Sequence, residues 1–496
     1  MKLLYTVLSL AAMFLSSGVC SLAAAKQPNV LLILVDDLKP SFGAYGAEFV
    51  HSPNLDRLAA RGMRFEAAYC NQAVCAPSRN NLLTGARSTS LGVYSLSRHF
   101  RKAAPDAITL PQYFKQHGYH AAGVGKVFHI GHGNTGDPKS WSEPFHPEKV
   151  IDYALTESTG GQLTREEAYF SNQALDRIGE LPRGAAWERA DVSDDDYSDG
   201  RIAIEGIERL RRFKESDKPF FLALGFTKPH LPFCAPEKYW ALYDDVDLQL
   251  STTHDYPDGA PRYAGKEKHG ELNQYKPIPH VPPLEPEVEK TLVQGYYAAL
   301  SYMDAQVGRV LDELDALGLA DDTIVVLWGD HGYHLGDHGA WTKHTNYEQA
   351  NRIPIIFAGP DVASPGSASS ALVETVDIYP TLAALAGLPT PDVPQPIDGQ
   401  SLAGVLSGEQ ESVRDHAYHA FPRGGGRLGR AVRTSRYRLV EWMRFGSDEP
   451  PEYELYDYQT DPLETRNQAG DYPELVEELR KKLDTHPAPI PPGGRR

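Results

Sequence analysis

Two pairs of polar residues are placed where they could bind a metal ion together. Asp36 and Asp37 directly follow one apolar run of the chain, and Asp330 and His331 follow another in the same manner. A hard cation such as Ca²⁺ prefers oxygen ligands, which both pairs supply. A single Asp-Asp pair is more often a loop or a helix cap, but two such segments that converge favour a metal site.

A second group of residues surrounds one cysteine. Cys75 opens the run Cys75-Ala76-Pro77-Ser78-Arg79, and an apolar helical run follows it. This pattern places Cys75 at a helix N-terminus, where exposed backbone amides favour an anion. Arg79 offers a permanently charged fork of donors that suits an oxyanion. A lone cysteine is usually a small buried thiol, but the residues at fixed offsets after this one indicate chemistry.

Further cations and histidines lie in loops beside these segments. Lys126 and His129 belong to Gly-Lys-Val-Phe-His, which follows a strand-like run from Tyr119, whereas His230 belongs to Lys-Pro-His and Lys343 to Trp-Thr-Lys. Each motif alone is compatible with a surface lysine or a half-buried histidine. Their common position after buried strands or beside the acidic pairs makes them candidate binding and proton-transfer groups.

The density of histidine also leaves a zinc site open. His331, His334, His338 and His344 fall within fourteen residues. Imidazole is a common zinc ligand, so these residues by themselves permit either zinc or calcium.

The elements that must position these residues have the pattern of an α/β protein. Residues 29–35 are continuously apolar and rich in branched side chains, which is typical of a strand buried on both faces of a sheet. Similar runs occupy residues 220–225, 323–327 and 353–357, and helical patterns occupy residues 54–61, 109–117, 202–213 and 288–317. The alternation predicts a sheet flanked by helices, with ligands bound at the carboxyl ends of its strands.

Two long polar stretches, residues 131–199 and 256–286, interrupt this alternation. Insertions of this length often shape a substrate cleft. After Gly399 the pattern changes to a hairpin-like pair at residues 430–442 and 453–458 and an amphipathic helix at residues 473–483. We therefore expect a main domain at residues 26–410 and a small C-terminal α+β subdomain at residues 411–496.

The N-terminal segment is typical of a secretory signal peptide. Lys2 precedes an apolar stretch at residues 3–15, and three alanines precede Lys26, which predicts a signal peptide at residues 1–25. The residues before Cys20 do not fit a lipoprotein processing site. The apolar stretch is too short for a comfortable membrane span, and no later segment is long and apolar enough. Export to the periplasm or the extracellular space is expected.

Charge and cysteine content restrict the partners. The chain has 49 Lys and Arg against 66 Asp and Glu among 496 residues, a formal net charge of −17, which disfavours nucleic acid. A local cluster of cations can still attract an anionic substrate. Export would leave Cys70, Cys75 and Cys234, so at least one thiol lies outside any intrachain disulfide, and a Cys70–Cys234 bridge is conceivable.

Together these motifs resemble those of the sulfatases, an alkaline-phosphatase-like superfamily. Cys-Ala-Pro-Ser-Arg followed by Leu-Thr-Gly is similar to the sulfatase signature, and the other motifs follow in the family's order over nearly all of the mature chain. The iduronate-2-sulfatase branch looks closest, because Lys126 and His129 are three apart and Asp-His-Gly stands where many relatives have Asp-Asn-Gly. The resemblance implies a large mixed sheet flanked by helices.

The resemblance also implies a nucleophile and a metal. Cys75 would be oxidised by a formylglycine-generating maturation enzyme, and one hydroxyl of the formylglycine hydrate would attack sulfur and expel the sugar hydroxyl. The other hydroxyl would then collapse to release sulfate. The ligands of Ca²⁺ would be Asp36, Asp37, Asp330, His331 and modified Cys75. Calcium is thereby favoured over zinc.

The remaining candidates receive roles from the same resemblance. Arg79 and the metal would hold the sulfate oxygens. Lys126 and His129 would orient the hydrate, with His129 as a base for the elimination. His230 and Lys343 would contact the sulfate and the leaving oxygen, with His230 as the general acid.

The implied substrate is a sulfated, uronic-acid-containing polysaccharide or its oligosaccharides, with 2-O-sulfate on iduronate or a related uronate. Two basic clusters could clamp the uronate carboxylate or could simply be solvated. One comprises Arg423, Arg427, Arg430, Arg433, Arg436 and Arg438, and the other comprises Arg98, His99, Arg101 and Lys102.

Two alternative hypotheses stay open. A phosphonate or phosphodiester hydrolase of the same superfamily would use the same motifs, because sulfate and phosphate esters share size and tetrahedral geometry. A sulfated-glycan-binding protein would leave Cys75 unmodified. Because calcium is favoured over zinc, His334 and His338 are expected to be loop or cleft-lining residues. The sequence indicates no oligomeric state.

Overall fold

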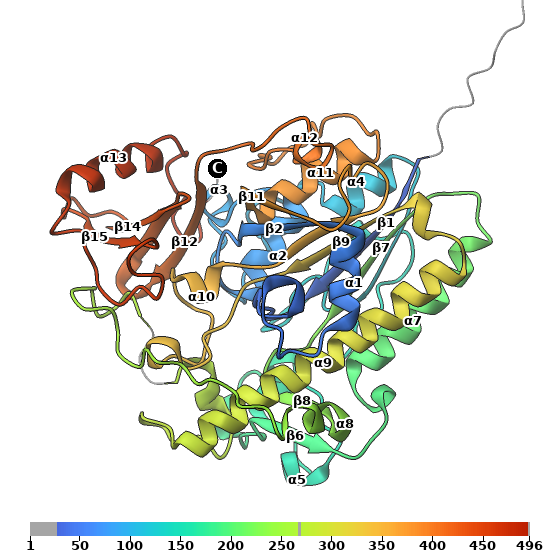
Figure 1. Cartoon of the computed structure of the whole chain (residues 1–496), viewed down its shortest axis with the longest axis horizontal. Helices are drawn as coiled ribbons and strands as arrows, with labels where there is room; N and C mark the ends of the chain where they lie inside the picture. Colours follow the sequence, from blue (N-terminus) through green and yellow to red (C-terminus); the bar gives the residue numbers. More distant parts are fainter. Residues whose placement is uncertain (1–26, 266–268, 495–496) are drawn as a thin grey trace, which may run out of the picture.

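A computed structural model of the chain describes residues 27–265 and 269–494. The predicted signal peptide therefore lies outside the described residues. A large mixed sheet packs between two layers of helices, and a smaller antiparallel sheet lies to one side (Figure 1). Within the two described ranges, none of the helices combines the length and the hydropathy that crossing a membrane would require.

The large sheet has the strand order β11-β2-β10-β9-β1-β7-β3. Its strands are β1 Asn29–Val35, β2 Gly62–Tyr69, β3 His120–Gly125, β7 Phe220–Phe226, β9 Thr323–Gly329, β10 Ile355–Ala358 and β11 Ser367–Glu374. β1, β3, β7 and β9 are parallel, whereas β10 runs antiparallel to both β9 and β2. Every residue of β1, β7 and β9 is buried, which explains why their sequences are continuously apolar.

The sequence predictions for this sheet were correct for its central parallel strands and weaker for β10, β2 and β11 on one side of it. β10 begins after Pro354, two residues later than predicted, because proline has no N–H to give to a strand ladder. β2 and β11 were not predicted, since their mixture of buried and partly exposed positions gives no continuous apolar run.

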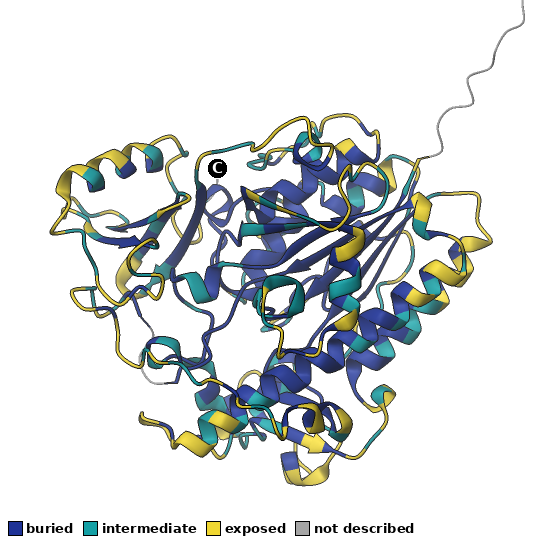
Figure 2. Ribbon diagram, viewed as in Figure 1, coloured by how far each residue is buried: buried dark blue, intermediate teal, exposed yellow. Residues whose placement is uncertain are grey.

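Alternate side chains of β1 enter two separate cores. Leu31, Ile33 and Val35 pack with one layer of helices, and Val30 and Leu32 with the other. The first layer holds α1 Pro53–Arg61, α7 Ser198–Lys214 and α9 Pro286–Ala316, and the second holds α2 Cys75–Thr84, α4 Leu110–Gln116 and α11 Ile378–Leu385. Figure 2 shows the buried sheet between helices whose outer faces are exposed.

The C-terminal subdomain is a four-stranded antiparallel sheet covered by one helix. Its elements are β12 Ala417–Arg423, β13 Arg427–Arg433, β14 Tyr437–Arg444, β15 Glu452–Asp457 and α13 Pro473–Leu483. The helix has the predicted bounds and packs onto the sheet through Val476, Leu479 and Leu483. The predicted first arm, residues 430–442, is instead parts of two strands, because Thr434 bonds to the backbone of Tyr437 and closes a turn.

Short elements occupy the connections. They are α3 Ser88–Leu91, β4 Ile130–Gly131, β5 Asn134–Thr135, α5 Thr156–Thr159, α6 Arg165–Ser171, β6 Trp187–Ala190, β8 Phe233–Pro236, α8 Glu237–Trp240, α10 Glu348–Asn351 and α12 Ala403–Leu406. The two predicted insertions meet: the N–H of Lys276 donates to the carbonyl of Gly184, and the N–H of Ala186 donates to that of Lys276, both at 2.8 Å.

Candidate active site

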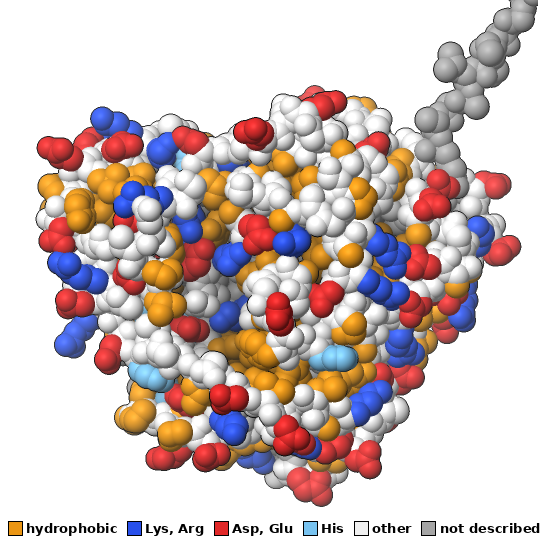
Figure 3. Space-filling view, in the orientation of Figure 1, with side chains coloured by type: hydrophobic (Ala, Val, Ile, Leu, Met, Phe, Trp, Pro, Cys, Tyr) orange, Lys and Arg blue, Asp and Glu red, His pale blue; other side chains and the backbone are white. Residues whose placement is uncertain are grey.

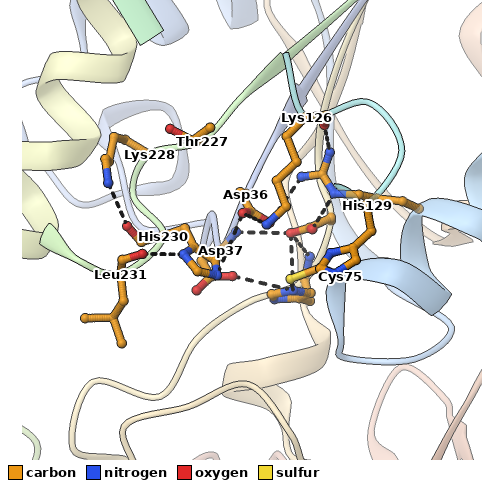
Figure 4. Close-up of polar contacts among 12 residues, drawn as sticks. Asp36, Asp37, Cys75, Lys126, His129, Thr227, Lys228, His230 and Leu231 are labelled. Atoms are coloured by element: carbon orange, nitrogen blue, oxygen red, sulfur yellow. Dashed lines mark hydrogen bonds and ion pairs between the residues drawn. The ribbon is translucent and has the colours of Figure 1, made fainter. Parts of the chain in front are cut away.

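The residues that follow β1 and β9 meet in one buried site. Figure 4 shows Asp36 and Asp37 of this site beside Cys75 and Lys126. These strands pair along their whole length, with Val35 opposite Gly329. The N–H of Asp37 donates to a carboxylate oxygen of Asp330 at 3.0 Å. The side chains of Asp36, Asp37 and Asp330 are inaccessible to solvent. Adjacent parallel strands thus bring together acidic residues almost 300 positions apart in sequence.

Helix α2 brings Cys75 and Arg79 to these carboxylates. Cys75 is its first residue, and Arg79 lies one turn further along. The Arg79 guanidinium donates from Nε to Asp330 at 3.0 Å and from Nη2 to Asp36 at 3.2 Å. Arg79 is fully buried and faces the two carboxylates rather than open space. It therefore offsets their charge and fixes their orientation, and its predicted contact with sulfate oxygens stays a prediction.

The neighbouring carboxylates differ in their ionisation. Burial alone would raise the pKa of Asp36, but the charges of Lys126, His230 and Arg79 hold it well below its usual range. Burial raises the pKa of Asp330 to about 6, and the Asp36 charge adds to this effect while His331 opposes it. Two carboxylates that repel one another in a buried site gain stability from a bound cation.

The donor set fits a divalent cation. One ligand atom each from Asp36, Cys75, Asp330 and His331 lies within 4.8 Å of the others. Oδ1 of Asp37 is buried without a hydrogen-bond partner and lies 3.5 Å from Nε2 of His331. Nδ1 of His331 donates to the carbonyl of Gly332, and Nε2 lies 3.3 Å from Sγ of Cys75, so Nε2 faces the cluster. The excess of oxygen donors favours a hard cation.

Lys126 and His129 approach the cluster from the end of β3. The Lys126 ammonium pairs with Asp36 and lies 4.9 Å from the ring centre of Phe170. Nε2 of His129 lies 3.0 Å from Nδ1 of His132, and Nδ1 of His129 is buried without a partner. Burial, with help from Lys126 and His132, holds the pKa of His129 well below its usual range. His129 is therefore neutral, and its unpartnered Nδ1 is left for a group other than the described residues.

His230 and Lys343 share a partner that the sequence analysis missed, Glu271. Nε2 of His230 lies 3.3 Å from one oxygen of Glu271, and Nζ of Lys343 lies 2.5 Å from the other. His230 is also 4.0 Å from Asp36, and Lys343 is 3.1 Å from Asp37. The only sequence signal for Glu271 was its place in a long insertion expected to shape a cleft.

A cavity of about 230 Å³ opens beside Cys75. Its lining residues are Cys75, Leu96, His129, His132, Glu166, Phe170, His230, Gly270, Glu271, Gln274, Lys343 and His344. Glu166 and Phe170 come from the first insertion and Glu271 from the second, so both insertions shape this cavity. Burial raises the pKa of Glu166 to about 8, and the Glu271 charge adds to the effect.

Most arginines of the C-terminal cluster bind other parts of the protein. Arg423 donates to the backbone carbonyls of Tyr263, Ala264 and His344. The other pairs are Arg430 with Glu441, Arg433 and Arg438 with Glu348, and Arg436 with Asp457, while Arg427 lies over the ring of Tyr263. These arginines hold the subdomain and the loop that carries Lys343. On the face shown in Figure 3, basic side chains likewise lie among acidic ones.

The second basic cluster lies nearer to the site. Arg101 is held by Asp137 in a two-point ion pair. Arg98 lines a small space together with Ala76 and His129, and its Nε is buried without a hydrogen-bond partner. Within this cluster, Arg98 therefore lies next to the catalytic candidate His129 and has an N–H donor without a partner.

The conceivable Cys70–Cys234 disulfide does not form. Both residues are buried free thiols. Cys70 packs in the core on one side of the large sheet and Cys234 in the core on the other, so the sheet separates them. His334 and His338 are held within loops, by the hydroxyl of Thr345 and by a backbone carbonyl respectively.

Comparison with known proteins agrees with this architecture. Residues 28–388 match the family model described as Sulfatase, and residues 336–488 match that of the N-sulphoglucosamine sulphohydrolase C-terminal region. Iduronate 2-sulfatase of Homo sapiens is 34% identical over an alignment that covers 89% of this chain and 91% of the relative.

Solved structures show the same fold at lower identity. One solved protein structure, determined in complex with its substrate D-glucosamine-2-N,6-O-disulfate, aligns with this chain at a TM-score of 0.70 and 23% identity. The alignment covers 93% of this chain and 97% of that protein. A phosphonate monoester hydrolase from Silicibacter pomeroyi has a TM-score of 0.69 and 24% identity, covering 93% and 95%. The predicted large mixed sheet flanked by helices is confirmed.

Proposed function

The chain belongs to the sulfatase family, and from that premise we propose that it removes 2-O-sulfate from iduronate or a related uronic acid in sulfated polysaccharides or their oligosaccharides. Hydrolysis of sulfate esters follows from the family. The uronate specificity is supported by similarity to human iduronate 2-sulfatase. The observation that carries the proposal is the convergence of Cys75 with the acidic pairs and a histidine-lined cavity.

We assign Cys75 as the precursor of the nucleophile. Burial and the neighbouring Asp36 raise the pKa of its thiol well above the usual range, so the unmodified side chain stays a thiol and is a weak nucleophile. Oxidation to formylglycine would supply a hydrate with two hydroxyl groups, one to attack sulfur and one to release sulfate. The position of Cys75 at the N-terminus of α2 supports this role.

The acidic cluster would hold Ca²⁺, whose charge would stabilise the sulfate oxygens in the transition state. Its ligands would be Asp36, Asp37, Asp330, His331 and modified Cys75. The unpartnered oxygen of Asp37 and the position of Nε2 of His331, which faces the cluster, support this assignment. Arg79 would keep Asp36 and Asp330 in place while their charge is shared with the cation.

The histidines and lysines around the cavity would manage protons. Lys126 would orient the nucleophile from its position beside Asp36. His129 would act as the base, since its ring is neutral and its Nδ1 has no protein partner. His230 would donate a proton to the leaving sugar oxygen, and Lys343 would offset charge on the same oxygen.

Arg98 is our candidate for binding the uronate carboxylate. It adjoins His129 and has unused donors, whereas the arginines of the C-terminal cluster have partners within the protein. Guanidinium binds carboxylate through two parallel hydrogen bonds. A substrate without the carboxylate should therefore lose affinity through Arg98 and not through the subdomain.

The first experiment is mass spectrometry of the Cys75 peptide from protein made in its native host. The mass of formylglycine in place of cysteine supports the proposal. Unmodified cysteine in fully active protein would refute the nucleophile, and in protein that binds sulfated glycans without turnover it would favour a binding role.

We expect export by the predicted signal peptide, which secretion of the full-length chain by that host would test.

The same preparation should then be assayed on matched substrates. A 2-O-sulfated uronate disaccharide should be hydrolysed faster than its 6-O-sulfated glucosamine counterpart. Phosphonate monoesters and phosphodiesters belong in the same assay, because a phosphonate monoester hydrolase shares the fold. Faster turnover of a phosphonate than of any sulfate ester would overturn the proposed function.

A further inference from the structure

Glu271 connects the two residues that we assign to the leaving oxygen. We propose that Glu271 is a positioning residue for departure of the sugar alcohol: it holds His230 with a hydrogen on Nε2 at the cavity, and it holds Lys343 beside that hydrogen. This inference rests on the proposed function, because it takes the roles of His230 and Lys343 from it. It assigns a task to an acidic residue in a cavity that receives an anionic substrate.

The contacts of the two ring nitrogens of His230 indicate where its protons lie. Nδ1 contacts the backbone carbonyl of Leu231, which can only accept, so Nδ1 carries a hydrogen. Nε2 lies 3.3 Å from an oxygen of Glu271 without a hydrogen bond to any described residue, and a negative charge at this distance favours a hydrogen on Nε2. The ring is wholly buried and meets Phe170 edge to face at 5.6 Å between ring centres. The ring plane is thus fixed, with Nε2 directed along the wall of the cavity.

Lys343 shares the same carboxylate. Its Nζ lies 2.5 Å from the second oxygen of Glu271, and Lys343 is only 2% exposed. Burial alone would raise the pKa of Glu271, but the charges of Lys343 and His230 hold it well below its usual range. Glu271 is therefore an ionised bridge that fixes the separation of the two donors.

The insertion reaches this position because of a glycine. Gly270 has φ +61°, and a Cβ there would lie 2.6 Å from Cβ of Thr342, the residue before Lys343. Glycine permits both the backbone conformation and this close approach. The segment is held from behind by Arg183, which donates to the carbonyls of Asn273 and Ile278. Glu271 is thus brought to Lys343 by backbone packing.

The test compares substrates that differ in their need for a proton on the leaving oxygen. A sugar alcohol is a poor leaving group and needs the proton, whereas the nitrophenolate of 4-nitrophenyl sulfate leaves without it. Glu271→Gln keeps the size of the side chain and removes its charge. We expect kcat/KM on the sulfated disaccharide to fall by about 10-fold to 100-fold, and on the aryl sulfate by less than about 3-fold.

Matched controls exclude general damage. Glu287→Gln changes an exposed acid in the first turn of α9 and should leave both substrates at parent rates. A disaccharide with fluorine beside the sulfated carbon, which lowers the pKa of the leaving hydroxyl, should recover part of the loss in Glu271→Gln. Equal losses on all three substrates at equal formylglycine content would overturn the inference.

His230→Asn separates this inference from the function on which it rests. If His230→Asn shows the leaving-group dependence and Glu271→Gln does not, Glu271 has no positioning role and the proposed function stands. If His230→Asn affects all substrates equally, His230 is not the general acid, and both its role and the inference fail. In the double variant the loss should be smaller than the product of the two single losses, because part of the effect of Glu271 passes through His230, and fully multiplied losses would refute action through His230.

Discussion

Glu348 is the residue whose replacement should weaken the joint between the main domain and the C-terminal subdomain. It lies in α10, five residues after Lys343, and contacts two arginines of the subdomain sheet. One carboxylate oxygen is 2.7 Å from Arg438 and 3.2 Å from Arg433, and the hydroxyl of Tyr69 donates to the other at 3.0 Å. Burial would raise the pKa of Glu348, but the two arginines lower it to about 2.

The size of the effect follows from that pKa. The ordinary value is 4.5, and each pKa unit corresponds to about 1.4 kcal/mol, so ionised Glu348 stabilises the folded state by about 3 kcal/mol. Because the folded pKa is depressed, this stabilisation is complete above pH 4.5 and is lost as the pH falls towards 2. Glu348→Gln should therefore lower the free energy of unfolding by about 3 kcal/mol at pH 7, and the deficit should shrink in acid.

Urea unfolding followed by circular dichroism at pH 7, 5.5, 4 and 3 would measure this difference. Glu449→Gln is a matched control in the same subdomain, because Glu449 is exposed and 3.6 Å from Arg444, and such surface pairs contribute less than about 1 kcal/mol. A deficit for Glu348→Gln that is the same at pH 7 and pH 3, or no larger than that of the control, would refute the reasoning.

The other predictions concern the active site directly. Cys75→Ala and Cys75→Ser should abolish turnover with unchanged circular dichroism, and full activity in either variant would contradict the mechanism. Asp37→Ala should weaken Ca²⁺ binding, measured by calorimetry on EDTA-treated protein, by more than about 10-fold, whereas unchanged affinity would remove Asp37 from the ligands. Gly270→Ala should lower kcat on the sulfated disaccharide, since the added Cβ meets Thr342. Gly179→Ala, where an added Cβ meets no other atom, should leave kcat unchanged. Equal effects of the two substitutions on kcat would contradict the packing argument.

The sequence by itself determined the elements in which local pattern and burial agree. β1 and β9 were predictable because they are buried on both faces and must therefore be apolar throughout. The amphipathic helix α13 was predictable because one face packs onto a sheet. The candidate site residues could be proposed because they lie in short motifs, most of them next to the end of a predicted strand or the start of a helix.

Tertiary structure decided the contacts between residues far apart in the chain. Glu271 acquires its partners His230 and Lys343 only when the second insertion packs against them, and the insertion has no local pattern that marks one acid among many. The same holds for Arg423, whose donors reach backbone carbonyls more than 70 residues away. A short motif specifies which side chains are present and what chemistry they can do. Tertiary packing decides how deeply each charged group is buried and which partner it contacts. Burial and partner together decide whether a charged group can bind substrate or stabilises the folded protein.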